Sequence, residues 1–255
     1  MRCLISFLFL FVASTLEAQL VIDSYRFASA STLNNGVMFH FSLDENGGNR
    51  VDSEPTNPNT LAEVNGVTNA PGIIGSAAFF EKANFEYLEA PDATDLSVGN
   101  EDFTFSAWVK PVTITSDMHI MSHYTVSPNQ RSWRMWCDSG ANRFTLGLSA
   151  DGIQSTNIAA NDYGVMVTNV WQHIVVQHDA VNNQMTIIVN ATNINTLPYN
   201  GGVHNSTGVF QVGARPTAGF FDGAIDECVG WRRVLTPAEV IELNNAGAGL
   251  TYPYP

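Results

Sequence analysis

The stretch FFDGAIDECVGWRRVLTPAEVIELNN, residues 220–245, changes character halfway along its length. Its first half alternates apolar and polar residues, as a strand does when one of its faces is buried. Its second half begins like a helix, because Thr236 can serve as the cap, Pro237 suits the first helical position, and Glu239 completes a capping box. We therefore predict a final strand that completes a sheet, followed by one short C-terminal helix that packs over it.

The rest of the chain consists of short apolar runs that are separated by Gly, Asn, Asp and Pro. In the run 102–110, Phe103 and Phe105 fall on one face and Thr104 on the other, a period of two that is typical of a strand. Similar runs occur at 36–43, 76–80, 119–125, 143–149, 173–179 and 184–190. Many short strands at this spacing predict an all-β fold, an antiparallel two-sheet sandwich. No internal repeat or linker divides the chain, so we expect one domain.

The composition excludes several classes of partner. The 255 residues carry a formal net charge of −13, which would repel a phosphate backbone, so we expect no nucleic acid. No run reaches the roughly 18 apolar residues that a spanning helix needs, so we expect no membrane span. Apolar residues make up 45% of the chain, as in a folded protein with a core. Nothing in the sequence predicts an oligomeric state.

The N-terminus has the layout of a secretory signal peptide. One Arg precedes an apolar run from Leu4 to Ala13, and cleavage is plausible after Ala18, although Leu16 replaces the usual small residue. We expect a secreted, extracellular or periplasmic protein. The alternative is a mis-called start codon upstream of VIDSYRF, with a cytosolic product. The expected segments are a signal peptide (1–18), an N-terminal extension (19–35), the β-sandwich (36–250) and a tail (251–255).

The cysteines leave two alternatives open. Cys3 would leave with the signal peptide, and Cys137 and Cys228 would remain. In an oxidising compartment these two could form one disulfide. Both also fall in strand-like runs, where isolated cysteines are commonly buried free thiols. There is no CxxC motif and no Cys/His cluster, so zinc is not expected.

Five further stretches, taken in order, carry a family resemblance. They are FSLDENGGNRVDS (41–53), APGIIGSAAFFEKANFEYLEAPD (70–92), DFTFSAWVKP (102–111), WQHIVVQHD (171–179) and FFDGAIDECVGWRRVLTPAEV (220–240). Together they resemble the laminin-G-like jelly-roll domains of the concanavalin A-like lectin/glucanase superfamily. The resemblance implies two packed antiparallel sheets whose first and last strands are neighbours. The chain departs from the family where His40 and Phe41 replace a frequent Trp, and where Cys228 replaces a valine-like core residue.

The superfamily includes retaining glucanases, whose paired acids lie on one strand in an E-x-D-x-x-E pattern. Nowhere in this chain does an Asp follow a Glu by two residues, and there is no G-x-S-x-G motif. The adjacent pairs Asp44-Glu45 and Asp226-Glu227 would point to opposite faces of a strand. A cross-strand dyad of Asp44 and Asp226 remains conceivable. We expect no enzyme, although a divergent glycosidase or lyase is not excluded.

The resemblance places Asp44 and Asp226 at positions that hold turns or ligate a structural calcium ion. Carboxylate and amide oxygens from turns are the ligands that Ca²⁺ takes. Two further residues could join such a site, namely Asp52 and Asn84. A structural Ca²⁺ site is therefore one expectation, and hydrogen-bonded turns are the alternative.

Carbohydrate recognition needs flat aromatic surfaces and a few fixed polar groups. In the stretch 130–144, Trp136 alternates with Arg134 and Ser132 on a polar strand face, whereas Trp133 falls on the face that looks like core. The candidate ligand-binding residues are Trp136, Arg134, Tyr124, His123 and Arg215. The alternative is that these aromatic residues only fill the sandwich.

The first functional hypothesis is a secreted, non-catalytic binding module that recognises a glycan or glycoprotein, with or without calcium. The second is a structural or adhesion subunit of a virion, such as a fibre or decoration protein, or of a cell envelope. The VIDSYRF start and the lack of a catalytic partner domain suit the second hypothesis. Processing after Ala18 would favour secretion, whereas retention of residues 1–18 or a start near Val21 would favour the virion.

Overall fold

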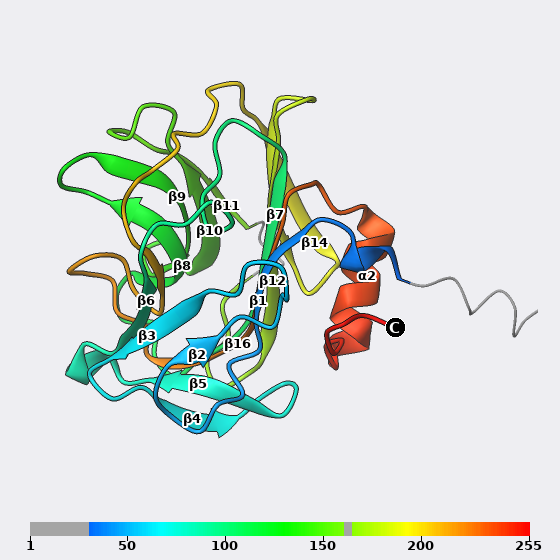
Figure 1. The fold of residues 1–255 in the computed structure, drawn as a ribbon. Coiled ribbons are helices and arrows are strands. Elements are labelled where there is room, and N and C mark those ends of the chain that lie inside the picture. The colour runs from blue at the N-terminus through cyan, green and yellow to red at the C-terminus, as the bar shows by residue number, and fades with distance from the viewer. Residues whose placement is uncertain (1–30, 161–164) are drawn as a thin grey trace, which may run out of the picture.

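The computed structural model describes residues 31–160 and 165–255, which form two antiparallel β-sheets packed face to face (Figure 1). The predicted signal peptide lies outside the described residues. The sandwich itself confirms the predicted fold class, two sheets with one short α-helix near the C-terminus. Within the described residues, no helix is long and apolar enough to cross a bilayer.

The first sheet has eight strands and is built around the stretch that opened the sequence. In sheet order the strands are β14 (Asn193–Pro198), β13 (Gln184–Val189), β12 (Gln172–Asp179), β7 (Phe103–Pro111), β16 (Gly223–Trp231), β5 (Ser76–Phe80) and β4 (Thr68–Pro71), and β1 (Val37–Phe41) pairs with β16 as well. The pairing of β1 with β16 confirms that the first and last strands are neighbours. Strand β16 is not an edge: β7 lies along one side of it, and β5 and β1 share the other.

The second sheet also has eight strands. Its order is β11 (Thr156–Ala159), β10 (Arg143–Leu148), β9 (Gln130–Asp138), β8 (Met118–Thr125), β15 (Phe210–Val212), β6 (Tyr87–Ala90), β3 (Thr60–Val64) and β2 (Arg50–Val51). Short 3-10 helices occur at η1 (Thr32–Asn34), η2 (Lys82–Asn84) and η3 (Asn245–Gly247).

The main core fills the space between the sheets. Phe103 and Phe105 are fully buried in it, as their alternation on β7 predicts, and the ring of Phe105 stacks on Trp133 of β9 at 4.0 Å. Cys137 and Cys228 lie in the same core as free thiols, so the disulfide that the sequence left open does not form. Cys137 is on β9 in one sheet and Cys228 on β16 in the other. Burial raises the pKa of both thiols.

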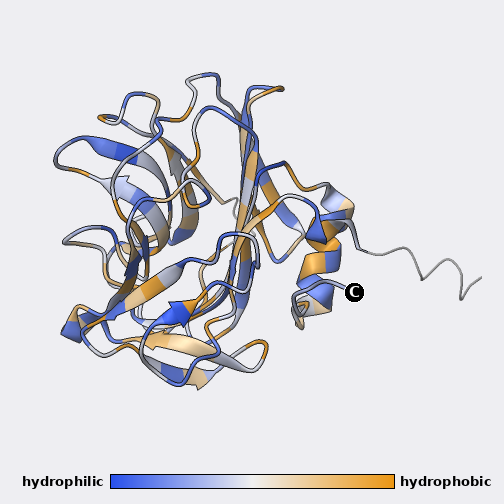
Figure 2. Cartoon of the chain, viewed as in Figure 1, coloured by the Kyte–Doolittle hydropathy of each residue, from blue (hydrophilic) through white to orange (hydrophobic). Residues whose placement is uncertain are grey.

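A second, smaller core covers the outer face of the first sheet. The helix α2 (Pro237–Asn244) contributes Val240 and Leu243, which pack with Trp231, Leu235, Leu33 and Tyr254. Figure 2 shows hydrophobic and hydrophilic residues in alternation along α2, as expected for a helix with one buried side. Residues 251–255, expected as a tail, take part in this core through Tyr254. The two chain ends also meet, because the Ser31 backbone N–H donates to the Pro255 carbonyl at 2.9 Å.

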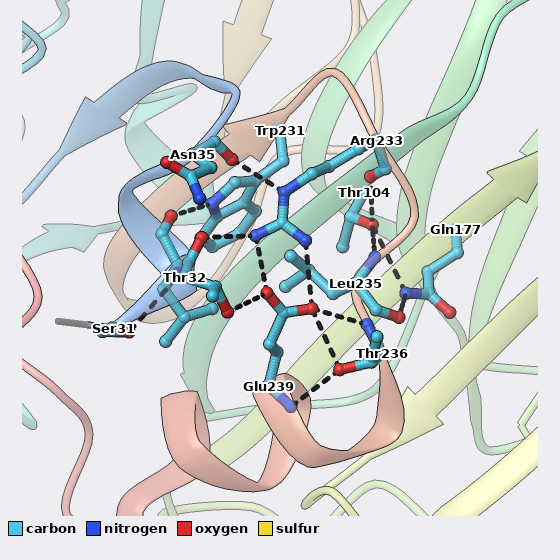
Figure 3. Close-up of polar contacts among 11 residues, drawn as sticks. Ser31, Thr32, Asn35, Thr104, Gln177, Trp231, Arg233, Leu235, Thr236 and Glu239 are labelled. Atoms are coloured by element: carbon cyan, nitrogen blue, oxygen red, sulfur yellow. Dashed lines mark hydrogen bonds and ion pairs between the residues drawn. The ribbon is translucent and has the colours of Figure 1, made fainter. Parts of the chain in front are cut away.

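The predicted helix start has the expected capping box (Figure 3). The Glu239 backbone N–H donates to Thr236 Oγ1 at 3.3 Å, and the Thr236 N–H donates to Glu239 Oε2 at 2.8 Å. Arg233 adds two hydrogen bonds to the Glu239 carboxylate, at 2.8 and 3.0 Å, and Thr32 adds one at 2.6 Å. Burial alone would raise the pKa of Glu239, but the bonds from Arg233, Thr32 and Thr236 lower it to about 2.

The strand-to-helix connection is also fixed to the sheet beneath it. Thr104 Oγ1 on β7 donates to the Arg233 carbonyl at 2.8 Å and accepts from the Leu235 N–H at 3.0 Å. Gln177 Nε2 on β12 donates to the Leu235 carbonyl at 2.8 Å (Figure 3). These bonds satisfy backbone groups where the strand has ended and the helix has not begun.

Candidate functional site

The sequence-predicted ligand residues lie mainly on the outer face of the second sheet. Along β9, Trp133 belongs to the main core and is fully buried. Because neighbouring residues of a strand point to opposite faces, Ser132, Arg134 and Trp136 point away from that core. The face on which the sequence placed Trp136 is therefore the outer face of the sheet.

Three of the predicted residues form one stack on this face. The Arg134 guanidinium lies 3.9 Å from the centre of the Trp136 ring and 4.7 Å from that of Tyr124. Gly147 on β10 pairs with Arg134, and a Cβ at this glycine would lie 3.0 Å from the Trp136 ring and 3.2 Å from Arg134 Nε. The glycine thus leaves the room in which the guanidinium lies flat. We call Tyr124, Arg134 and Trp136 the arginine stack.

The arginine stack changes what Trp136 offers to a ligand. Trp136 is only 3% exposed and Tyr124 only 6%, so neither ring is an open platform for a sugar. Arg134 is partly exposed and covers the ring that the sequence suggested as the platform. The group that this part of the face presents is a guanidinium held between two aromatic rings.

The other two predicted residues have different surroundings. Arg215 lies in the turn that follows β15, next to β8, where Ser122 Oγ donates to the Ala214 carbonyl at 2.8 Å. Burial is the largest cause that lowers the pKa of Arg134, and the positive charge of Arg215 lowers it further. His123 is not part of this group. Its ring bonds to the Gly208 carbonyl at 2.7 Å and lies 3.6 Å from Asp92, which places it against a loop.

A row of polar side chains crosses four strands of the same face. Strand pairing sets Arg134 on β9 opposite Ser122 on β8, Ser122 opposite Gln211 on β15, and Gln211 opposite Glu89 on β6. Gln211 Nε2 donates to Glu89 Oε2 at 2.6 Å. We call Arg134, Ser122, Gln211 and Glu89 the polar row.

Several buried polar atoms on this face have no hydrogen-bond partner. They are both ring nitrogens of His119, Ser132 Oγ, Arg134 Nε, Thr145 Oγ1 and Gln211 Oε1. A buried polar group without a partner costs about 1–3 kcal/mol, so native proteins keep few of them and tend to keep them where something else binds. Their concentration around the arginine stack and the polar row is a sign of a binding surface.

An exposed aromatic patch lies at the β6 end of the polar row. Tyr87 precedes Glu89 by two residues and so shares its face. The Phe220 ring lies 6.1 Å from Tyr87 and 5.2 Å from Phe85, which is 58% exposed and has a left-handed φ of 58°. We call Phe85, Tyr87 and Phe220 the aromatic patch. The aromatic patch was not predicted from the sequence, although the two-residue spacing of Phe85, Tyr87 and Glu89 around the buried Leu88 was a readable signal.

The predicted metal ligands hold turns. Asp44 accepts a hydrogen bond from the Ser76 N–H at 2.6 Å, and Asp226 accepts from the N–H groups of Ile73 and Ile74 at 2.8 and 3.2 Å. The two carboxylates therefore fix one turn from its two sides. Burial and the charge of Glu227 raise the pKa of Asp226 to about 8, against the effect of its backbone hydrogen bonds.

The remaining two predicted ligands are also engaged locally. Asp52 accepts from the backbone N–H groups of His40 and Glu54, and Asn84 donates to Glu81 and Glu86. In the part of the chain that the structure describes, no three His, Cys, Asp or Glu side chains gather as a metal site would require. The side chains present fit the turn alternative, and calcium binding stays a prediction.

One arrangement beneath α2 has the residue types of a nucleophilic triad. His173 Nε2 lies 2.8 Å from Ser106 Oγ, and its Nδ1 lies 3.3 Å from Asn244 Nδ2. Asn244 Oδ1 accepts from the Gly247 N–H at 3.0 Å, so the amide must donate to His173 Nδ1. The His173 proton is then on Nε2 and points at Ser106. A ring in this tautomer cannot take the serine proton, which is the first step of such catalysis.

A groove lies elsewhere, at one end of the sandwich. It has a volume of about 990 Å³ between the loops that contain Asn59 and Asp95. Its polar groups are largely paired: Asn59 Nδ2 donates to Asp95 at 2.8 Å, and Arg232 pairs with Glu101. The outer face of the second sheet is therefore the better candidate, because its polar groups lack partners.

Comparison with known proteins places the fold. A family model of the concanavalin A-like lectin/glucanases superfamily matches residues 82–241, which is more than half of the chain. No curated protein matches. The solved structures include domain 4 of AbnA, an extracellular arabinanase from Geobacillus stearothermophilus, in complex with arabinotriose. That match has 20% identity and a TM-score of 0.62, and it covers 81% of this chain and 97% of the other.

Two toxin structures are similar over much of this chain. The binding domain of Paraclostridial Mosquitocidal Protein 1 has 15% identity and a TM-score of 0.66, over 85% of this chain and 53% of its own. Botulinum neurotoxin type C, whose cell entry depends on two ganglioside molecules, has 16% identity and a TM-score of 0.66, over 86% and 53%. The chain thus spans about half the length of these toxin chains. The two antiparallel sheets and the pairing of β1 with β16 agree with the family match. The chain belongs to the concanavalin A-like lectin/glucanase superfamily.

Proposed function

We propose that this protein is a non-catalytic binding module that recognises carbohydrate, either free or on a glycoprotein. Its binding surface in this proposal is the outer face of the second sheet, from the arginine stack along the polar row to the aromatic patch. Sugars are bound by aromatic surfaces together with a few directed polar groups, and this face carries both. The arabinotriose of the AbnA domain and the gangliosides of the type C neurotoxin give the proposal further support.

The observation that carries the proposal is the position of the polar row. It connects the arginine stack on β9 with the aromatic patch beside β6, three strand spacings or about 14 Å away. Gln211 Oε1, between the two ends of the row, is buried and has no protein partner. A short oligosaccharide that follows the row would contact its partly exposed members, Arg134 and Glu89. The exposed end of this path, Phe85 and Tyr87, is where ring stacking is sterically open.

Within residues 31–160 and 165–255, the side chains that could do chemistry are engaged in other contacts, which supports a binding role. Asp44 and Asp226 are both used in holding one turn and so are not a free acid/base pair. Ser106 Oγ accepts a hydrogen bond from His173 Nε2 and is not activated by that ring. On the outer face of the second sheet, Glu89 is bonded to Gln211 and Asp138 to the Ala141 backbone N–H.

We further propose that the protein acts outside the cell that makes it, because residues 1–18 have the pattern of a signal peptide. N-terminal sequencing of the protein from its native host tests this directly. A mature N-terminus at Gln19 is expected, and retention of Met1 would overturn export by this signal.

The test of the binding function is a glycan-array screen of the full chain, run once with calcium and once with a chelator. The strongest hit is then titrated by calorimetry against Phe85→Ala and Tyr87→Ala, which remove exposed rings without opening the core. Each substitution should weaken binding about 3- to 10-fold, the usual contribution of one stacked aromatic ring. The matched control is Ile241→Ala, a similarly exposed apolar residue on α2 at the other side of the sandwich.

Each outcome has a distinct meaning. Equal binding by the patch variants and the Ile241→Ala control would place recognition elsewhere on the molecule. Binding that survives the chelator would remove calcium from the proposal. Silence across a broad array would overturn carbohydrate recognition and favour the structural or adhesion subunit of a virion or cell envelope.

A further inference from the structure

Two basic residues lie on or beside the outer face of the second sheet, although the whole chain is acidic, with 24 acidic and only 11 basic residues. Arg134 lies on this face in β9, and Arg215, in the turn after β15, is near enough for its charge to lower the pKa of Arg134. Within residues 31–160 and 165–255, neither guanidinium forms an ion pair with a carboxylate, and that of Arg134 makes no hydrogen bond. Two like charges that are near each other, partly buried and without a carboxylate in contact, repel each other.

The nearest carboxylates are committed to other partners. Asp117 accepts hydrogen bonds from the N–H and the hydroxyl of Ser139 at 3.1 and 3.0 Å. Asp138 accepts from the Ala141 N–H at 3.0 Å, and Glu89 is bonded to Gln211. Asp117 and Asp138 attract the Arg134 charge from a distance but do not neutralise it by contact.

We propose that this site binds an acidic sugar, one whose carboxylate is held by Arg134 and Arg215. The proposal rests on the carbohydrate-binding function above and names the class of sugar. A guanidinium presents parallel N–H donors that match the two oxygens of a carboxylate. The stacking of Arg134 between Tyr124 and Trp136 fixes the plane of that fork before a ligand arrives, so little conformational entropy is lost on binding.

The groups around the arginine pair suit the rest of a sugar ring. His119 is almost completely buried, its ring stacks on Trp136 at 6.3 Å, and the backbone of Gly219 lies beside its Nδ1. Burial, together with the charges of Arg134 and Arg215, lowers the pKa of His119, so the ring is neutral and offers one donor and one acceptor. The hydroxyls of Ser132 and Thr145 are unpartnered. Sugar hydroxyls are complementary to such a mixed set of donors and acceptors.

The test is an array of acidic glycans, each paired with a neutral counterpart: uronate oligosaccharides with their methyl esters, and sialylated glycans with the desialylated forms. The full chain is used at about 0.15 M salt, where the Debye length of about 8 Å screens the net negative charge but not a direct contact. At least one acidic member should bind about tenfold more tightly than its partner, as expected for a charge-assisted hydrogen bond.

The tightest acidic glycan is then titrated against Arg134→Gln and Arg215→Gln. Lys110→Gln is the control, because it makes the same change of charge at the end of β7 in the other sheet. Each arginine variant should lose about tenfold in affinity and the control should not. Because Arg134 is packed in the stack, the melting temperature of its variant is measured alongside, and Arg215 serves as the variant on a surface turn.

The outcomes separate this inference from the function on which it rests. Equal binding of acidic and neutral members would overturn the acidic-sugar inference and leave carbohydrate binding intact. A preference for acidic glycans that both arginine variants retain would overturn the assignment of the site. Silence of the whole array would overturn both.

Discussion

We expect the carboxylate of Glu239 to make the main electrostatic contribution to the packing of α2 on the sandwich, and Glu239→Gln tests this. The carboxylate receives hydrogen bonds from Arg233, from Thr32 in η1, and from the backbone and hydroxyl of Thr236 (Figure 3). Glutamine keeps the length of the side chain and one acceptor oxygen for the capping box. The substitution therefore removes the charge and replaces the acceptor oxygen that faces Arg233 and Thr32 by an N–H donor.

The magnitude follows from the pKa of this carboxyl. A fall from 4.5 to about 2 corresponds to about 3 kcal/mol, at 1.36 kcal/mol per pKa unit. Glu239 is buried but Arg233 is partly exposed, so solvent screens part of this energy. We expect Glu239→Gln to lower the free energy of unfolding by about 2 kcal/mol at pH 7, or the melting temperature by about 4–8 °C for a domain of this size.

The effect should depend on pH in one direction. The folded-state pKa is lower than the unfolded one, so the stabilisation is complete above pH 5 and is lost as the pH falls toward 2. The difference between the wild-type protein and Glu239→Gln should then be constant from pH 6 to 8 and shrink progressively below pH 5.

The assay is urea unfolding at pH 7, 4 and 2.5, followed by tryptophan fluorescence. Glu242→Gln is the control, because it removes an exposed carboxylate from the same helix. Identical unfolding midpoints for Glu239→Gln and Glu242→Gln at pH 7 would refute the reasoning. So would a Glu239→Gln deficit that persists unchanged at pH 2.5, because it would have to come from packing instead of charge.

Three further predictions concern the packing of the sandwich. Gly147→Ala should lower the free energy of unfolding by about 1–3 kcal/mol, because the new Cβ would lie 2.6 Å from Asn157 Oδ1 and 3.0 Å from Trp136. An unchanged urea midpoint would contradict the close packing of the arginine stack. Thr104→Val should cost about 1–3 kcal/mol, measured in the same way, because it leaves the Leu235 N–H without its acceptor. Cys137 and Cys228 should react with a thiol reagent only in denaturant, and a reducing agent should leave the melting temperature unchanged; a fall in that temperature would reveal a disulfide.

The parts of the fold that local sequence rules govern could be predicted. Thr236, Pro237 and Glu239 define the helix start through contacts within four residues, and the structure has the same capping box. The inner face of β7 follows from the alternation of Phe103 and Phe105, since each strand has a buried side. The long-range pairing of β1 with β16 was predicted from the family resemblance.

The geometry of the candidate site was less accessible from sequence. The alternation along β9 places Trp136 and Arg134 on one face. It does not predict that the guanidinium lies over the Trp136 ring, because that position depends on Gly147 in the neighbouring strand. An irregularity in the pairing of β8 with β9, between His123 and Tyr124, decides which of the two residues joins the stack. A bulge of this kind breaks the period of two on which the prediction relied.

The meeting of the chain ends has a consequence for how the protein can be displayed. Ser31 bonds to Pro255, and Asn34 exchanges two hydrogen bonds with Tyr254, at 2.7 and 2.9 Å, beside α2 on the first sheet. The candidate binding surface is on the second sheet, at the other side of the sandwich (Figure 1). A tether joined after Pro255 would therefore direct that surface outward. Immobilisation through a tag after Pro255 should leave ligand access intact, which makes this end the natural anchor for a sensor surface or for multivalent presentation.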